Sequence, residues 1–335
     1  MSQIEYDFEF PQKEMSFQQR MLRYLKFLII PFFKPRELSQ WEAKVAQYKS
    51  QRKFFRKLLN PITLLGFGII IFIVTLAVFS SWLTPFSYRE LAEYTFEGSF
   101  SAPSPEHILG QTLLGRDVLG RIIWGAQTSL TLGSVSIIIS VTGGVIIGII
   151  SAYIGGIPDS IIMRIFDILL AFPTLIIVFI FIAIFGQNIN IILIAFGILG
   201  IPAYARLIRG SVLQVKEGVF IEAAKVSGAN NFKIMFKYIL PNVISPIIIA
   251  ISFDYGAIIL GLAGLSFLGL GDPNTIEWGV DINAGRLRLY SAPWASLWPG
   301  LMIFITVLGF MLVGDGLRDA LDPRLKATKK RRVKR

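Results

Sequence analysis

Few side chains in this 335-residue sequence could carry out covalent chemistry. It contains no cysteine and a single histidine, His107, which excludes thiolate metal sites, cysteine nucleophiles and histidine-based relays. No Gly-x-x-x-x-Gly-Lys-[Ser/Thr] motif occurs, so the chain cannot cradle nucleotide phosphates in the P-loop manner. We therefore predict that this chain has no catalytic residue, no metal site and no cofactor of its own.

One ionisable residue lies near the middle of a long apolar run, Asp254. Ionisable residues in such positions are functional candidates by default, because a charge is costly in a bilayer. Two interpretations of Asp254 remain open: contact with a hydroxyl or ammonium group of a transported substrate, or pairing with a neighbouring helix. Nearer the start of another run, Arg164 precedes Asp167 by three residues, and this spacing predicts a local ion pair.

The most informative polar segment is Val215–Asn242, between two apolar runs. Its first half is compatible with a helix, and the break Ser227–Asn230 contains Gly228, which accepts a positive φ. Apolar residues then return at helical spacing, and we expect Pro241 to end this second helix just before the next run. The segment predicts two short helices joined by a turn, with Glu222, Ala223 and Ala224 around the bend.

The composition indicates the kind of structural element that carries these residues. Hydrophobic residues make up 53% of the chain, charged residues 16%, and the mean hydropathy is +0.61. These values exclude a disordered chain and argue against a water-soluble protein. Six segments are long and apolar enough to cross a bilayer: residues 62–83, 130–154, 161–185, 189–208, 243–268 and 297–317. Pro173 predicts a kink within the third segment, and Gly155–Gly156 predicts a tight turn before it.

The distribution of basic residues predicts the orientation. With the N-terminus inside, 28 of the 33 Lys and Arg residues fall on the cytoplasmic side, which predicts six spans with both termini cytoplasmic. The net charge of +11 then records topology, and the basic tail after residue 328 is interpreted as contacting anionic lipid, not nucleic acid. Residues 1–61 do not have the pattern of a signal peptide, and Phe27–Phe33 suits an interfacial helix.

The Val215–Asn242 segment resembles the EAA loop of ABC-transporter permeases. The resemblance rests on Glu222-Ala223-Ala224, on Gly228 after three further residues, and on Leu240-Pro241 near the fifth span. It implies that these six residues belong to a coupling helix that sits in a groove of a cytoplasmic ATPase. On this interpretation the change Gly228→Asp uncouples transport and leaves membrane insertion intact, whereas Asp254 and Leu262 bear on substrate choice.

Other motifs are similar to the C-type subunit of dipeptide and oligopeptide permeases, over about residues 52–326. They are His107–Gly110 with Leu114–Leu119, Leu265–Gly271, and Gly314–Leu325. The resemblance implies that His107, Gly115, Arg116 and Asp117 are candidates for docking a binding protein. Two positions depart from the family pattern: Gln111-Thr112 in the outer loop, and Leu262, where a glutamate is expected in a pore-forming region.

This resemblance implies an all-α integral membrane protein with the type I ABC importer (MetI-like) fold. The implied regions are a cytoplasmic segment 1–61, a first transmembrane helix 62–83, an extracytoplasmic loop 84–129, a five-helix permease core 130–317 containing the coupling loop 215–242, and a basic tail 318–335.

The implied partners are a B-type permease, two cytoplasmic ATPases that bind ATP and Mg²⁺, and an extracytoplasmic solute-binding protein. The implied location is the cytoplasmic membrane of a prokaryote, and di- and oligopeptides are the default substrates. Two alternatives stay open: the same architecture importing oligosaccharides, nickel or opines, and a self-contained secondary transporter. The latter would need its own ion-relay residues and usually internal repeats, neither of which is evident here.

Overall fold

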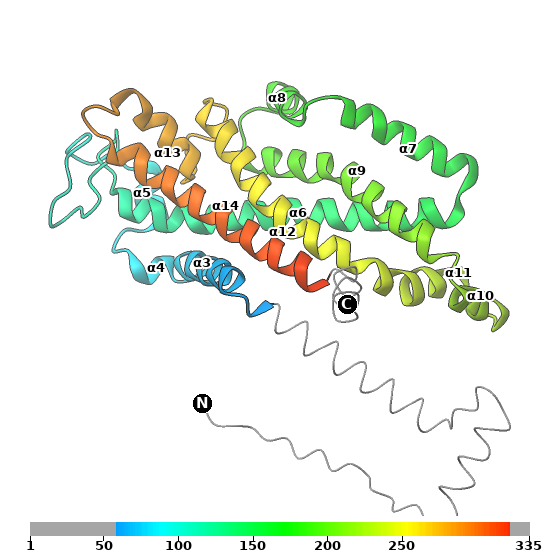
Figure 1. Ribbon diagram of the computed structural model, residues 1–335. Helices are drawn as coiled ribbons and strands as arrows, with labels where there is room; N and C mark the ends of the chain where they lie inside the picture. The colour runs from blue at the N-terminus through cyan, green and yellow to red at the C-terminus, as the bar shows by residue number, and fades with distance from the viewer. Residues whose placement is uncertain (1–57, 322–335) are drawn as a thin grey trace, which may run out of the picture. The chain divides into compact units, whose positions relative to one another are not determined.

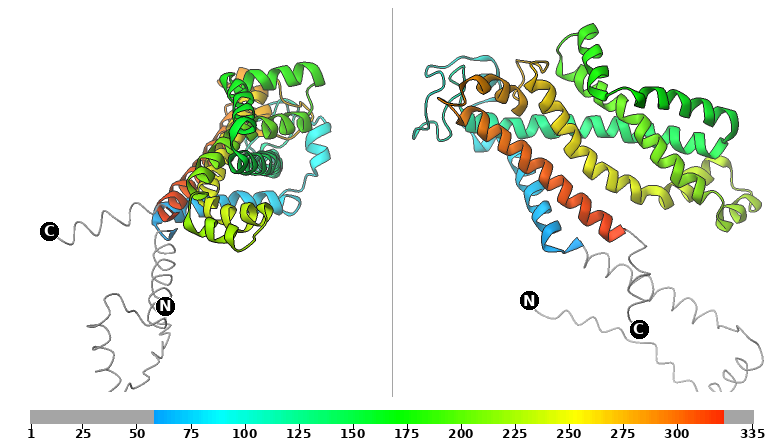
Figure 2. Two further views of the ribbon diagram at one scale, coloured as in Figure 1. Left: turned by 90° about the vertical axis from the view of Figure 1, so that its right-hand side faces the viewer. Right: turned by 45° about the horizontal axis from the view of Figure 1, so that its top comes forward.

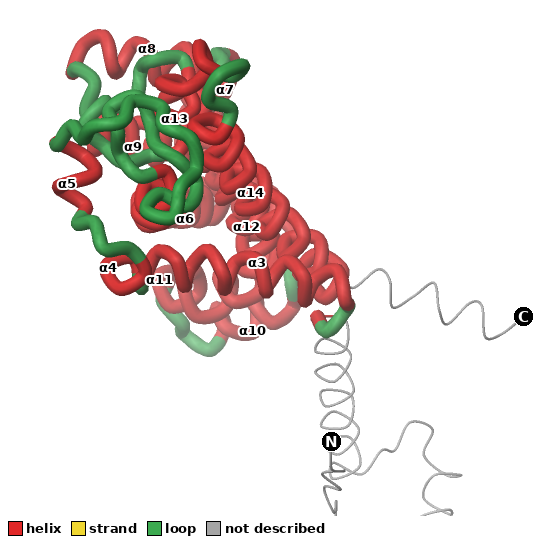
Figure 3. The backbone as a smooth tube through the Cα atoms, turned by 90° about the vertical axis from the view of Figure 1, so that its left-hand side faces the viewer, coloured by secondary structure: helices red, strands yellow, loops and turns green. Residues whose placement is uncertain are grey.

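The computed structural model describes residues 58–321, so the expectations for the N-terminal segment up to residue 57 and for the tail after residue 321 lie outside the described residues. Within 58–321 the chain forms helices and loops without a β-strand (Figure 3). The helices are α3 (Pro61–Val78), α4 (Ser80–Leu83), α5 (Tyr88–Glu93), α6 (Val118–Ile154), α7 (Gly156–Ala171), α8 (Thr174–Phe185), α9 (Ile189–Val215), α10 (Val219–Val226), α11 (Asn231–Lys233), the π-helix η1 (Ile234–Ile239), α12 (Leu240–Phe267), α13 (Trp278–Gly285), the 3-10 helix η2 (Arg286–Arg288) and α14 (Trp294–Leu321).

The membrane-spanning architecture predicted from the apolar runs is confirmed. Among the described residues, five helical segments are long and apolar enough to cross a bilayer, and α7 with α8 makes a sixth if this bent pair counts as one span. The long helices run alongside one another (Figures 1 and 2). Helices α5 and α13 lie at one end of this bundle and α10 and α11 at the other (Figure 1). The start of α3 and the end of α14 point toward the end that carries α10.

Helix α6 is longer than the predicted second span, because it begins at Val118 instead of near Leu130. The Asp117 side chain caps it by accepting a hydrogen bond from the Gly120 backbone N–H at 2.6 Å. Residues assigned to the outer loop from sequence therefore form the first turns of α6. Hydropathy alone misses these turns, since they pack against the outer loop and α13.

The prediction of a kink at Pro173 is wrong. Helix α7 ends at Ala171, α8 begins at Thr174, and the two axes differ by 86°. Proline disfavours the helical conformation of the residue before it, and Phe172 is extended, with ψ of 139°. The third apolar run is thus two helices that meet at an angle. The predicted glycine turn before α7 is confirmed, because Gly155 and Gly156 both have a positive φ.

Small residues bring α6 and α9 together. A Cβ added to Gly144 would lie 3.0 Å from the Ala205 backbone nitrogen on α9. Nearby, the hydroxyls of Ser136 and Ser140 donate hydrogen bonds to the carbonyls of Leu193 (3.0 Å) and Gly197 (2.8 Å). Close approach at small residues, with hydroxyls bonding across helices, is how membrane helices pack without a hydrophobic driving force.

Helix α7 is attached to α9 by ion pairs. The Asp159 carboxylate accepts hydrogen bonds from Arg209 at 2.6–3.0 Å and from the Ser151 hydroxyl at 2.5 Å. The Asp167 carboxylate pairs with Arg206. The predicted local pair between Arg164 and Asp167 is therefore wrong, because the α9 guanidinium occupies this carboxylate.

Candidate functional site

The segment predicted to be a coupling loop begins with helix α10, which has two different sides. Ile221 and Ala224 are buried, and Ile221 packs into a cluster formed by the adjoining ends of α6, α9 and α12. On the other side Val219 and Val226 are 79% and 90% exposed. Helix α10 is thus fixed to the bundle along one side and presents an apolar surface on the other.

The turn after α10 depends on Gly228, whose φ is +78°. The Gly228 N–H donates to the Lys225 carbonyl and the Ala229 N–H to the Ala224 carbonyl, both at 3.0 Å, which is a Schellman cap. A Cβ at Gly228 would have no atom within 4 Å. The backbone conformation, and not lack of space, is therefore what requires glycine here.

The second half of the segment differs from the expectation that a helix ends at Pro241. The chain continues without a break from α11 through the π-helix η1 into α12, and Pro241 lies in the first turn of α12. A π-helix has a wider turn than an α-helix, and here the Leu240 N–H donates a hydrogen bond to the Met235 carbonyl, five residues earlier. The Asn242 side chain donates to the Tyr238 carbonyl at 2.7 Å. The π turn and this side-chain bond explain how the helix passes a proline that removes an N–H.

Side-chain hydrogen bonds tie the loop to the ends of two long helices. The Tyr153 hydroxyl at the end of α6 donates to Asn231 Oδ1 at 2.8 Å, and Lys216 Nζ donates to the Ala152 carbonyl at 2.9 Å. A pocket of about 430 Å³ lies between these elements, and Glu222 lines it beside Glu217 and basic groups. The loop that contains α10 is therefore bonded to the end of α6 at two points.

The two candidate pore residues lie in different surroundings. Asp254, on α12, is half-buried. Leu262 is 4% exposed and packs in an apolar cluster with Leu132, Val178 and Ile192. Leu262 thus lies in the interior of the subunit, whereas Asp254 is partly exposed.

The outer-loop candidates hold the loop together. His107 Nδ1 and Asp117 Oδ1 are 3.0 Å apart, and Arg116 donates to the Tyr94 carbonyl at 2.8 Å. Gly115 has a φ of +69°, and a Cβ there would collide with the Glu97 carbonyl oxygen. Arg116 and Asp117 are buried. A partner docking on this loop would meet exposed neighbours that the sequence reasoning did not select, namely Ile108, Leu113 and Leu114.

A buried ion pair at this end of the bundle is not evident from the sequence. Arg121 Nε donates to Asp281 Oδ1 at 2.6 Å, and Arg121 Nη1 donates to the Leu91 carbonyl at 2.6 Å. Beside this pair the fully buried Trp278 donates its indole N–H to the Ile122 carbonyl at 3.1 Å. The sequence does show a charged residue, Arg121, in the first turn of the apolar helix α6, but its partner Asp281 lies 160 residues away.

The buried carboxyl group of Glu277 makes the stability of this end of the protein depend on pH. It caps α13 by accepting from the Val280 N–H at 3.2 Å, outside the apolar spans. Burial raises the pKa of Glu277, and the nearby Asp281 carboxylate raises it further. The protonated form is favoured in the folded state, so this stabilisation is complete below the ordinary glutamate pKa and is lost as the pH rises above it.

Glu277→Gln keeps a capping acceptor and removes the charge. We expect its thermal unfolding midpoint in detergent to fall less between about pH 5 and about pH 8 than that of the unsubstituted protein. Glu93→Gln, which removes an exposed carboxylate from the same region, is the matched control. An identical slope for Glu277→Gln and the unsubstituted protein would contradict the assignment.

Comparisons with known proteins place these features in a family. Residues 144–327 match the family described as binding-protein-dependent transport system inner membrane component. The chain is 40% identical over 278 residues to the dipeptide transport system permease protein DppC of Alkalihalophilus pseudofirmus, covering 82% of this chain and 90% of that protein. It is 39% identical over 278 residues to the glutathione transport system permease protein GsiD of Pectobacterium atrosepticum, covering 82% and 92%.

One solved structure aligns with part of this chain. A crystal structure of an amino acid ABC transporter with histidines aligns with 61% of this chain and 95% of its own, with a TM-score of 0.47 and 18% sequence identity.

Proposed function

The chain belongs to the family of binding-protein-dependent transport system inner membrane components, and on that premise we propose that it is one permease subunit of an ATP-driven importer of di- and oligopeptides. It would form the pore with a second, B-type permease. Two cytoplasmic ATPases would bind ATP and Mg²⁺ and contact α10, and an extracytoplasmic protein would deliver the substrate. In this scheme the subunit itself does no chemistry.

The observation that carries the proposal is the construction of α10 and its glycine cap. The helix packs through Ile221 on the adjoining ends of α6, α9 and α12, and it presents Val219 and Val226 outward. A partner that grips the outer side of α10 could therefore move these helices as rigid bodies. The glutamate, alanines and glycine of the predicted coupling motif all belong to this one element.

The position of α10 also bears on the orientation of the chain in the membrane. If α10 faces the cytoplasm, the start of α3 and the end of α14, which point toward the same end of the bundle, face it as well (Figure 1). This supports the orientation predicted from the charge distribution, with 28 of the 33 basic residues inside. We therefore propose that both termini are cytoplasmic and that α5, α13 and the outer loop face the binding protein.

The proposed substrate class rests on the relatives. One curated relative is named for dipeptides and another for glutathione, which is itself a tripeptide. Asp254 supports a peptide substrate, since a half-buried carboxylate could accept a hydrogen bond from an ammonium group.

The proposal is tested by uptake into proteoliposomes holding both permeases and both ATPases. We expect uptake of a labelled dipeptide that requires ATP inside and binding protein outside, and that excess unlabelled dipeptide suppresses. ATP-driven uptake of a labelled oligosaccharide, unaffected by peptides, would overturn the substrate class alone. Uptake that does not require ATP would overturn the proposal as a whole.

A further inference from the structure

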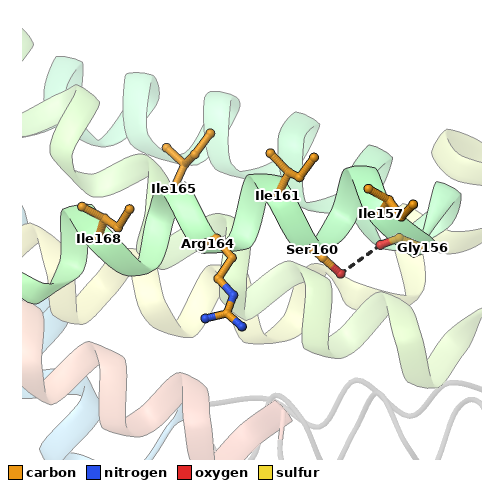
Figure 4. Close-up of a pocket in the computed structure, with 7 residues that line it drawn as sticks. All are labelled: Gly156, Ile157, Ser160, Ile161, Arg164, Ile165 and Ile168. Carbon is orange, nitrogen blue, oxygen red and sulfur yellow. Dashed lines mark hydrogen bonds between the residues drawn. The ribbon is translucent and has the colours of Figure 1, made fainter.

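Helix α7 differs from its neighbours in how it is attached to the subunit. Asp159 is its only buried residue, so no apolar side chain of α7 is buried in the bundle. Four of its isoleucines form a row that is 52–76% exposed: Ile157, Ile161, Ile165 and Ile168. Figure 4 shows this row pointing the opposite way from Arg164 on the same helix. Helix α8, in contrast, buries Val178 and Ile182 in an apolar cluster with α9 and α12.

The ion pair at the start of α7 joins three helices. The Asp159 carboxylate accepts hydrogen bonds from Arg209 on α9 and from the Ser151 hydroxyl near the end of α6. The Asp159 side chain is only 7% exposed. Separating this pair would leave a buried charge without a partner, which is strongly unfavourable. The start of α7 is therefore firmly fixed to the bundle.

The second ion pair, two turns further along α7, is attached more weakly. Asp167 pairs with Arg206 of α9 alone, and the two side chains are 56% and 51% exposed. No hydroxyl or backbone group adds a bond to this carboxylate among the described residues. Of the two pairs, this is the one that can separate without leaving a charge buried inside the subunit.

Both ends of α7 are joints in the backbone. Gly155 and Gly156 precede the helix with φ of +70° and +67°, and a Cβ at Gly156 would meet nothing within 4 Å. Glycine adopts either sign of φ, so this joint can turn without a collision. At the other end Phe172 is extended, and α8 leaves at 86° to α7. Hinges in proteins are a few such residues at the ends of elements.

We propose that α7 is a hinged arm. The buried pair Asp159–Arg209 is its pivot, and the exposed pair Asp167–Arg206 is a latch that opens when the subunit changes conformation. The inference rests on the proposed function, because an importer has to alternate between two conformations. Opening of the latch turns the far end of α7 away from α9 while Asp159 stays in place. Asp159 is thus a positioning residue, and the latch pair controls the movement.

Distances between spin labels test the hinge in the purified chain, without transport. The chain has no cysteine of its own, so labels on introduced cysteines report only the chosen positions. One pair of exposed positions lies beside the latch and one beside the pivot: Ile168 with Leu207, and Ile157 with Gly210. We expect Asp167→Asn to shift the distance between the latch labels to longer values and to leave the pivot labels unchanged.

Arg164→Gln is the matched control for the spin labels. It removes a neighbouring charge of α7 that pairs with no carboxylate in residues 58–321, and it should shift neither distance. An unchanged distance between the latch labels in Asp167→Asn would overturn the hinged arm. An equal shift at both pairs of labels would overturn the role of Asp159 as the pivot.

Reversible cross-linking tests whether the latch opens during transport. The double variant Asp167→Cys with Arg206→Cys is joined by a short bifunctional thiol reagent that a reductant removes, and it is then reconstituted with the second permease and the ATPases. We expect the link to abolish uptake of a labelled dipeptide and the reductant to restore it. Asp159→Cys with Arg209→Cys, linked in the same way, is the matched control. Its link closes a pivot that does not open, so linked protein should take up no less than reduced protein.

The outcomes separate this inference from the proposed function. If the unsubstituted transporter shows no ATP-dependent uptake, the proposed function fails, and the spin-label distances alone decide whether α7 is hinged. If uptake is normal but linked and reduced latch variants transport equally, the latch does not open and the inference is wrong. Loss of uptake on linking the pivot as well as the latch would overturn the division between a fixed and a moving end of α7.

Discussion

Gly228→Val is expected to reduce substrate uptake by about tenfold or more while the chain still inserts in the membrane. A residue other than glycine in the left-handed conformation costs about 1–2 kcal/mol, and a β-branched residue is the least tolerated. Since the Gly228 φ is +78°, valine would disrupt the cap that fixes the end of α10. The ATPases would then hydrolyse ATP without moving α6, α9 and α12.

Two further variants identify the cause. Gly228→Asp adds a charge at a position with open space and a backbone that aspartate tolerates better than valine does. If backbone conformation dominates, Gly228→Asp is the milder change; if the surface contacts the ATPase, the added charge also uncouples transport. Gly210→Ala, at an α9 glycine whose Cβ would meet nothing within 4 Å, is the matched control.

The measurements are labelled-peptide uptake and binding-protein-stimulated ATPase activity in proteoliposomes, with insertion checked by the amount of chain in the membrane. Coupling through α10 predicts that Gly228→Val loses uptake and stimulation together. Uptake and stimulation at the unsubstituted level in Gly228→Val would show that this loop does not couple the subunits.

Arg121→Met is expected to cause the largest loss of stability of any single substitution considered for this protein. Arg121 and Asp281 are almost completely buried, with side chains 4% and 5% exposed. Removing one partner leaves the other charge buried without compensation, which typically costs about 3–5 kcal/mol. Methionine preserves most of the volume, so the effect reports the lost charge and the lost hydrogen bond to the Leu91 carbonyl.

Thermal unfolding of the detergent-purified chain measures this loss. The control is Arg89→Met, which removes an exposed ion pair with Glu93 and is expected to change stability very little. The double variant Arg121→Met with Asp281→Leu removes both charges and should recover most of the stability. An unfolding midpoint for Arg121→Met as high as that of Arg89→Met would refute a structural role for the buried pair.

The sequence by itself determined the class of the protein, its apolar spans and the position of the candidate coupling segment. A membrane helix is defined by about 20 consecutive apolar residues, which is a local property that can be read without knowing the fold. The loop motif is also local: Gly228 was identified because a helix break with glycine between two helical patterns predicts a cap. These predictions needed no contact between distant residues.

Only the tertiary structure decided which side chains meet. The partner of Asp167 is Arg206 and that of Asp281 is Arg121, and neither pair is close in sequence. Proline has the same local effect everywhere, yet the chain breaks near Pro173 and passes Pro241 unbroken. The difference lies in the turns around each proline: Phe172 is extended, while a π-helix precedes Pro241. Such outcomes depend on packing between elements, which no single segment encodes.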